Sequence, residues 1–372
     1  MPLSPADRRA DIDAKQAALL PVLRSLGVDT LALFMPAHVA WFTAGMNVPG
    51  LIPDTERPGV YTNGQSRWLV CSNADSQRLF DEDLDGLGFQ LKEWHWEAGR
   101  SDFLAYLTDG ARVAADRPFP GIPLANEHLR PLLRVLTPFE QLQYRDLGAL
   151  VAEAVETTAR AFAHGRTEQE VAAQVGHRLL HHGVEPVALS VTADGRGAKY
   201  RRAGAGPHPV TRTAVVQATG SRDGLFVTCS RTVSLGPVPP DFAAAHDLAV
   251  KQAGSFRSWT KSNKTIGAIG VAGRAVLGGG PFEFDYRLSP PGYGAGRFAA
   301  EFLGRPGAEE VLAAGNAVVW QPRVGPAAVV DTLLVTDAEP AAVTPPGEWP
   351  VKRVVVRGGP PQDIADVLVR DV

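Results

Sequence analysis

The sequence contains few residues whose type and setting suggest a reaction, and His208 is the first of them. It lies in GAGPHP (204–209), between glycines and prolines and just before a segment with the composition of a strand. Catalytic groups concentrate in loops that a rigid scaffold positions, and an imidazole titrates near neutral pH, as a general base must. His208 is therefore a candidate general base. The alternative is an exposed loop histidine without a chemical role.

Other patterns that carry chemistry are weak or absent from the sequence. His177 and His181 have the spacing of one helix face, but Arg178 follows His177, so the H-E-x-x-H pattern of a zinc site is not formed. A solvated helix end, where histidines meet the negative pole of the dipole, is the simpler interpretation. The sequence has no G-x-S-x-G motif and no Walker loop. The sequence therefore offers no strong local signature of a reaction.

Composition limits the classes of function. The chain has 372 residues, which favours two domains, and a net charge of −3, which gives no reason to expect binding to nucleic acid or to an anionic membrane. No apolar run is long enough for a membrane helix, and the N-terminal residues do not resemble a secretory signal. Cys71 and Cys229 cannot form a disulfide framework. We therefore expect a protein of a reducing compartment, the cytoplasm.

The first part of the chain predicts an α/β domain. Apolar residues at helical spacing predict a helix over 7–26, and Gly27 is a typical C-terminal stop. Short apolar runs predict strands at 30–34, 67–71 and 111–115. Strands that alternate with helices indicate a partly parallel sheet. We place this domain at residues 1–136.

The second domain, residues 137–372, begins with two capping boxes. In the first, Thr137 and Glu140 flank Pro138 at the first helical position, which predicts a helix to about residue 163; in the second, Thr167 and Glu170 begin a helix to about residue 182. Further predicted elements are strands at 187–193, 214–218, 225–233, 317–321 and 329–335 and a helix from Asp241, as its cap, to about residue 253. These elements predict an α+β domain with helices on one side of a largely antiparallel sheet.

The order of short motifs along nearly the whole chain resembles the creatinase/prolidase/aminopeptidase P/methionine aminopeptidase superfamily, whose catalytic domain has the pita-bread fold. In the first domain, LGVDTLAL (26–33) followed by WFTAG (41–45) is similar to the family's N-terminal opening. The similar segments of the second domain are 139–163, LFVTCSRTVSLGPV (225–238), GYGAG (292–296) followed by Glu301, GNAVVWQP (315–322) and DTLLVT (331–336). The resemblance implies an α/β N-terminal domain and an α+β pita-bread C-terminal domain.

The resemblance also shows where this sequence departs from the family. Metallopeptidases of the family hold two divalent cations with two Asp, one His and two Glu. Their positions fall here on Gln217, Thr228, Tyr293, Gln321 and Val330, and the family's second histidine falls on Ala300. Neutral amide and hydroxyl oxygens are poor ligands for divalent cations, and valine has no lone pair. We therefore expect no dinuclear metal centre, no metal-activated hydroxide and no other cofactor.

Creatinase, which works without metal, gives His208 a more definite role. Its catalytic histidine matches the GPH segment at 206–208, which implies that His208 acts as general base on water and general acid to a leaving nitrogen. Glu301, retained from the family pattern, would orient or charge-balance it. The carboxylates with which creatinase binds a guanidinium have no counterpart at Ser230, Gln321 or Val330. Creatine is therefore not the expected substrate.

Three functions remain open on the sequence. The first is a pseudo-peptidase that binds a peptide or small-molecule ligand in an uncharged pocket rimmed by Phe226, Phe298 and Trp320, although Trp320 fits a core position equally well. The second is a metal-independent C–N hydrolase that uses His208. The third is an Xaa-Pro dipeptidase with non-standard metal ligands. The resemblance further implies a homodimer.

Overall fold

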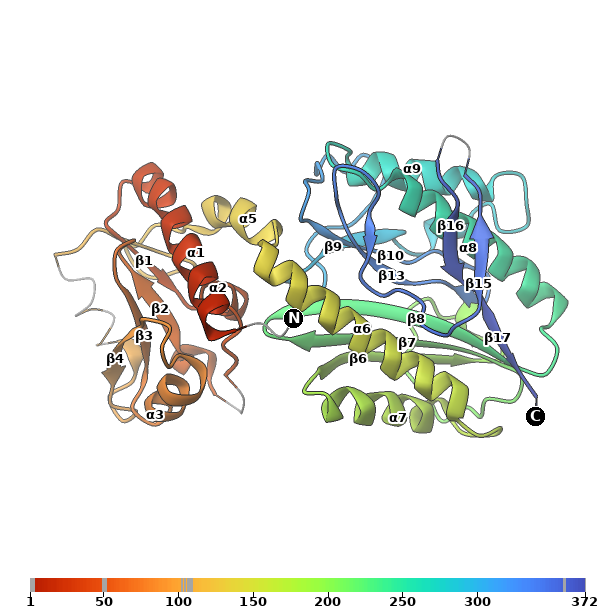
Figure 1. The fold of residues 1–372 in the computed structure, drawn as a ribbon, viewed down its shortest axis with the longest axis horizontal. Coiled ribbons are helices and arrows are strands. Elements are labelled where there is room, and N and C mark those ends of the chain that lie inside the picture. The colour runs from red at the N-terminus through yellow and green to blue at the C-terminus, as the bar shows by residue number, and fades with distance from the viewer. Residues whose placement is uncertain are drawn as a thin grey trace. The chain divides into compact units, whose positions relative to one another are not determined.

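The chain divides into two units, Met1–Glu140 and Gln141–Val372. The computed structural model describes residues 4–48, 52–101, 103, 105, 110–356 and 359–371. Both units combine helices with sheets (Figure 1). The division falls just after the boundary at Leu136 that the sequence suggests, because the first turn of the helix that begins at Pro138 belongs to the first unit.

The first unit contains a five-stranded mixed sheet in the order β4-β3-β2-β1-β5. Its strands are β1 (Thr30–Leu33), β2 (Gly59–Thr62), β3 (Arg67–Ser72), β4 (Gln90–Trp94) and β5 (Val113–Ala115). Strand β1 runs parallel to β5 and β3 parallel to β4, whereas the β1–β2 and β2–β3 pairs are antiparallel. The helices are α1 (Pro5–Leu26), α2 (Pro36–Phe42), α3 (Ser76–Arg78) and α5 (Asn126–Arg134). The predicted partly parallel α/β domain is confirmed.

Helix α1 has well-defined ends and a buried ionic contact. Ser4 and Asp7 form a capping box at its start, and Gly27 ends it in the left-handed region with φ +66°, a conformation that glycine adopts at little cost. The ammonium of Lys15, which is 2% exposed, lies 2.5 Å from Asp11 and 2.6 Å from Glu140. These contacts join α1 to the first turn of the helix that begins at Pro138.

The second unit contains two four-stranded sheets. One has the order β17-β8-β7-β6 and the other the order β14-β13-β10-β9, and two short pairs, β11-β12 and β15-β16, lie beside them. The first sheet consists of β6 (Glu185–Ala193), β7 (Thr213–Arg222), β8 (Leu225–Leu235) and β17 (Val367–Arg370). The second consists of β9 (Gly292–Ala295), β10 (Ala317–Trp320), β13 (Asp331–Leu334) and β14 (Ala341–Ala342). The short pairs are β11 (Arg323–Val324) with β12 (Ala327–Ala328) and β15 (Val351–Val354) with β16 (Gln362–Ala365).

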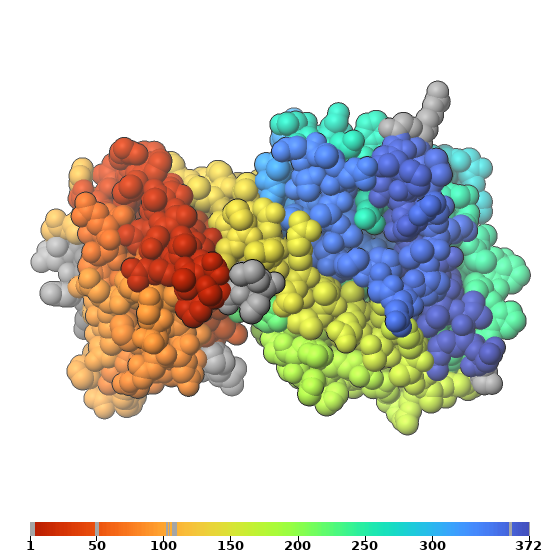
Figure 2. All heavy atoms as spheres, in the orientation of Figure 1, coloured from red at the N-terminus to blue at the C-terminus, as the bar shows by residue number. Residues whose placement is uncertain are grey.

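Helices cover both parts of this unit, which differs from the single sheet with helices on one side that the sequence suggests. Helix α6 (Pro138–Ala161) and helix α7 (Glu168–His181) lie beside the sheet of β6, β7 and β8 (Figure 1). Helix α6 forms part of the surface seen in Figure 2, where it is yellow beside the blue C-terminal residues. Helix α8 (Pro240–Trp259) instead contacts α9 (Ile266–Arg274), β12 and β16. The result is the pita-bread arrangement, with each layer of strands covered by its own pair of helices.

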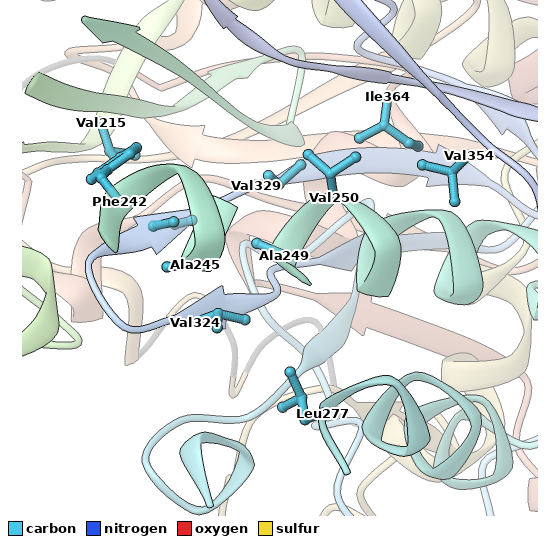
Figure 3. Close-up of a cluster of buried hydrophobic side chains, with 12 residues drawn as sticks. Val215, Phe242, Ala245, Ala249, Val250, Leu277, Val324, Val329, Val354 and Ile364 are labelled. Atoms are coloured by element: carbon cyan, nitrogen blue, oxygen red, sulfur yellow. The ribbon is translucent and has the colours of Figure 1, made fainter. Parts of the chain in front are cut away.

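Apolar side chains of α8 hold it against the short strands. Val250 and Ala249 lie with Val329, Val354 and Ile364 in one buried cluster (Figure 3). Burial of such side chains contributes about 25 cal/mol per Å² of apolar surface removed from water. This cluster therefore fixes α8 and the segment that follows β10 relative to each other.

The local signals at helix starts are mostly confirmed. Thr137 and Glu140 exchange hydrogen bonds as a capping box, and so do Thr167 and Glu170. The prediction that Asp241 caps the next helix is wrong. Helix α8 begins at Pro240, after Pro239, so Asp241 lies inside its first turn. The helix dipole still stabilises a carboxylate at this place. Within the described part of the chain, no helix has the length and apolar character required to cross a membrane.

Candidate functional site

The two sheets of the second unit are joined at Thr228 and Ser230 on β8. The amide of Thr228 donates to Oγ1 of Thr332 at 3.0 Å, and that hydroxyl donates to the Thr228 carbonyl at 2.7 Å. The amide of Ser230 donates to the Val330 carbonyl at 2.9 Å, and the amide of Val330 donates to Oγ of Ser230 at 2.8 Å. Side-chain hydroxyls thus take the place of a continuous backbone ladder. Thr228 and Val330, two of the five candidate positions, lie at this junction.

Tyr293 reaches the same junction from β9. Its hydroxyl donates to Oγ1 of Thr228 at 3.2 Å, and Oγ1 of Thr228 lies 2.9 Å from Oγ1 of Thr219. The Tyr293 ring packs on a small apolar cluster that contains Val319 and Val330. Burial raises the pKa of Tyr293, so its hydroxyl is neutral at physiological pH. Three candidate positions are therefore brought together as neutral groups that contact one another.

The side chain of Gln217, another of the five candidate positions, forms a contact that the sequence did not reveal. It lies on β7 opposite Ser230, and its Oε1 accepts a hydrogen bond at 2.6 Å from the guanidinium of Arg323. Burial lowers the pKa of Arg323, and the neighbouring charges of Arg201 and Arg202 lower it further. Across the described ranges, Arg323 has no ion pair with a carboxylate. The only sequence signal was the presence of an arginine two residues after Gln321.

The side chain of Gln321, the remaining candidate position, contacts a different segment. Strand β10 ends at Trp320, and the Gln321 amide donates to the Pro291 carbonyl at 2.8 Å. Its side-chain Nε2 donates to the Pro290 carbonyl at 3.0 Å. The side chain therefore holds the segment before β9 and does not join the contacts of Tyr293 and Thr228. Trp320 itself is 3% exposed and stacks on Phe256 with ring centres 4.3 Å apart, so it is a core residue, and it also lines a small pocket next to Arg257 and Asp331.

His208 lies in an exposed loop that a buried carboxylate anchors. The Glu168 side chain accepts from the Gly206 amide at 2.8 Å and from Arg196 at 2.6 Å, while the Glu168 amide donates to the His208 carbonyl at 2.9 Å. For the His208 imidazole the structure records no hydrogen bond to a described residue. No hydrogen bond to a described residue therefore orients the ring as a general base requires.

Glu301 and Ala300 lie on the segment that follows β9. The amide of Glu301 donates to the Gly294 carbonyl at 2.9 Å, so this segment runs beside the strand that carries Tyr293. Glu301 is half-buried and Ala300 is exposed. The roles of His208 and Glu301 in catalysis stay predictions.

A separate buried network lies next to the junction on β8. Arg231, whose side chain is fully buried, lies 2.8 Å from Glu156 and 3.0 Å from Asp331, and it also donates to the Thr344 carbonyl. Although burial disfavours its charge, these contacts keep the pKa of Arg231 above its ordinary value. This arginine matches the family motif of the resemblance, and its contacts are those of a structural residue.

The residues at the five positions do not fit a pair of divalent cations. Their donor atoms are two amide oxygens, a threonine hydroxyl and a neutral phenol, and Val330 provides none. No group of three or more His, Cys, Asp or Glu side chains that could hold a metal ion occurs among residues the structure describes. A guanidinium also lies against Gln217, where it repels cations.

Comparison with known families and structures supports this fold. Residues 143–337 match the profile of Peptidase_M24, metallopeptidase family M24. Among solved structures, dipeptidase PepE from Mycobacterium ulcerans is 18% identical with a TM-score of 0.75, and the alignment covers 98% of this chain and 99% of that one. The Xaa-Pro dipeptidase from Bacillus anthracis is 12% identical with a TM-score of 0.74, covering 97% and 100%. A search of curated protein sequences finds no match.

The fold also occurs in a structure whose name does not describe a peptidase. The N-terminal domain of FACT complex subunit SPT16 from Cicer arietinum is 11% identical with a TM-score of 0.63, and the alignment covers 91% of this chain and 97% of that one. At these identities the likeness concerns the fold alone.

Proposed function

This chain belongs to metallopeptidase family M24, and we propose that it is a member that binds a peptide or small-molecule ligand without a dinuclear metal centre and without metallopeptidase activity. The observation that carries the proposal is the contact of Arg323 with Gln217, beside the hydrogen-bonded Tyr293 and Thr228.

The electrostatics of this contact oppose metal binding. Dinuclear sites of this kind depend on carboxylates that offset the charge of the cations, and none stands at the five positions. A divalent cation about 4 Å from a guanidinium would be disfavoured by roughly 8 kcal/mol at an effective dielectric constant of about 20. This repulsion would add to the loss of ligands. The neutral phenol of Tyr293 carries no negative charge with which to compensate.

The two alternative functions have less support. The hydrolase needs an oriented His208, and the imidazole lies in an exposed loop. The dipeptidase takes its support from the names of structures that share the fold, and it needs metal ligands that the five positions do not supply. The SPT16 domain supports the proposal to the extent that a protein named as a complex subunit uses this fold.

The test is a metal and activity measurement on the purified full chain. The protein is incubated with Mn²⁺ or Zn²⁺, desalted and analysed for bound metal, and hydrolysis of alanyl-proline is followed with and without EDTA. The matched variant restores the family ligands and removes the guanidinium: Gln217→Asp, Thr228→Asp, Tyr293→His, Gln321→Glu, Val330→Glu and Arg323→Gly. We expect metal only in the variant. About two bound ions in the unmodified chain, together with hydrolysis that EDTA abolishes, would overturn the proposal.

We also propose a homodimer and a cytoplasmic location, both of which derive from the sequence. Sedimentation velocity at micromolar concentration tests the dimer, and a monomer over the whole concentration range would contradict it. Fractionation of the source cells tests the location.

A further inference from the structure

A pocket beside Arg323 is a feature of the second unit that the proposed function does not use. It is lined by residues of α8 and α9, by the segment before β9 and by 321–323, and it is open to solvent on one side. A ligand here would therefore be only partly enclosed. We infer that this pocket binds a small organic anion, in which a carboxylate or phosphate group contacts Arg323 and Arg274 and an apolar body fills the remaining space.

The charges of the pocket favour an anion. Its charged lining residues are Arg274, Arg323 and Asp285. The carboxylate of Asp285 is already engaged, because it accepts from Arg201 at 2.9 Å and from the Gly325 amide at 2.6 Å. Neither Arg274 nor Arg323 forms an ion pair within the part of the chain that the structure covers. The pocket is therefore lined by two arginines that form no ion pair with a described residue, beside an aspartate that is paired with Arg201.

Arg323 is the stronger of the two anchors. Its hydrogen bond goes to Gln217, a neutral acceptor, and the residue is half-buried. Burial of a charge is costly unless an opposite charge or several hydrogen bonds compensate it. A bound oxyanion would supply that compensation, since the planar guanidinium matches the geometry of carboxylate and phosphate groups.

Arg274 and the apolar lining complete the recognition surface. Arg274 is the last residue of α9, and its guanidinium lies 3.6 Å from the centre of the Tyr286 ring, which limits its freedom. Apolar side chains provide most of the remaining wall: Val271, Leu277, Pro291, Pro306 and Pro322. An inorganic anion would leave these unused, whereas a carboxylate or phosphate with an aliphatic or aromatic body would cover them.

The inference rests on the proposed function in one respect, namely that Arg323 keeps its place because no metal ion displaces it. Isothermal titration calorimetry on the metal-analysed full chain tests it with 3-phenylpropionate and phenyl phosphate as probes. The neutral control is 3-phenylpropionamide, and inorganic phosphate shows whether the apolar body contributes. We expect saturable binding of at least one organic anion, no binding of the amide, and weaker binding of inorganic phosphate.

Two variants locate the binding. Arg323→Gln and Arg274→Gln should each weaken the preferred probe by about tenfold or more, the usual contribution of a charge-assisted hydrogen bond. Arg305→Gln is the control, because this substitution removes the same charge at a residue that lies between two lining residues and does not itself line the pocket. Arg274 is exposed, so that variant should fold even if Arg323→Gln does not.

The inference is overturned if neither anion binds, if the amide binds as well as the acid, or if both variants bind like Arg305→Gln. Inorganic phosphate that binds as tightly as the organic probes would overturn the role of the apolar wall. Failure of the proposed function has a different signature, bound metal and EDTA-sensitive hydrolysis. The two failures are therefore distinguishable in the same preparation.

Discussion

Two arginines of the second unit, the fully buried Arg231 and the half-buried Arg323, should respond differently to the same substitution. Methionine keeps much of the volume of arginine and removes its charge and hydrogen bonds. Arg231 lies between the carboxylates of Glu156 and Asp331, whereas the recorded hydrogen bond of Arg323 goes to neutral Gln217. The comparison therefore asks whether each charge stabilises the fold or is kept for another reason.

The magnitudes follow from these partners. Arg231→Met leaves Glu156, whose side chain is 4% exposed, with the longer contacts to Arg160 at 3.2 Å and to the Gly347 amide at 3.3 Å. Loss of one partner from a buried pair costs about 3–5 kcal/mol, and we expect that loss of stability. Arg323→Met removes one hydrogen bond, at a cost of about 1–3 kcal/mol, and relieves the burial of an uncompensated charge, which is worth a similar amount. We expect a net change within about 1 kcal/mol of zero.

The assay must report the second unit alone, because two units need not unfold together. Urea titration read by hydrogen exchange of peptides from β8 meets this requirement. The exposed pair of Arg353 and Asp363 supplies the control, since Arg353→Met should leave the midpoint unchanged. A loss at Arg323 as large as that at Arg231 would refute the reasoning. It would show that Arg323 has a counter-charge and serves the fold, and the anion pocket would lose its main argument.

Three further predictions concern packing and titration. Gly148→Ala should destabilise the second unit by about 3 kcal/mol in urea unfolding, because a Cβ there would lie 2.0 Å from the carbonyl oxygen of Val343. In the control, Gly176→Ala, the Cβ meets only the end of a leucine side chain at 3.3 Å, and the free energy of unfolding should rise by up to about 1 kcal/mol. Partial burial would raise the pKa of Asp194, but hydrogen bonds from the loop and strand that follow lower it below its ordinary value. The carboxylate therefore stabilises the fold above the unfolded pKa of about 4, and this stabilisation is lost as pH falls through the lower folded pKa. Asp194→Asn should therefore flatten acid unfolding, and an unchanged acid limb would contradict this. Burial raises the pKa of Cys229 to about 12, so it should react with Ellman's reagent only after denaturant is added.

Local signals in the sequence predicted those parts of the fold that depend on neighbouring residues. The capping boxes at Thr137 and Thr167 and the stop at Gly27 involve groups within a few positions of each other, and all three are present. The strands β7 and β8 extend beyond their predicted ends, because pairing along their whole length outweighs local preference. The prediction for Asp241 was wrong because an acidic residue is favourable both at the N-cap and in the first turn of a helix.

Long-range contacts explain what the sequence did not predict. The junction of the two sheets depends on Thr332, whose hydroxyl bonds both backbone groups of Thr228 from a strand 104 positions away. The contact of Arg323 with Gln217 joins residues separated by 106 positions. Hydropathy and spacing carry no information on such pairs. The five candidate positions came from the resemblance, and the structure shows that three of them contact one another while Gln217 and Gln321 have separate partners.

By the resemblance, neutral groups stand where the family has carboxylates, and this difference would do more than remove metal ligands. Four carboxylates without cations would repel one another, so loss of the ions favours loss of the acids. A guanidinium can then approach Gln217, and its charge reverses the electrostatic preference of the region from cations to anions. The pocket beside Arg323 offers this charge to a ligand together with an apolar wall. On this reasoning, restoring the acids while Arg323 stays in place should yield an internal ion pair and little bound metal, and efficient metal binding by that variant would show that the guanidinium is not the deciding group.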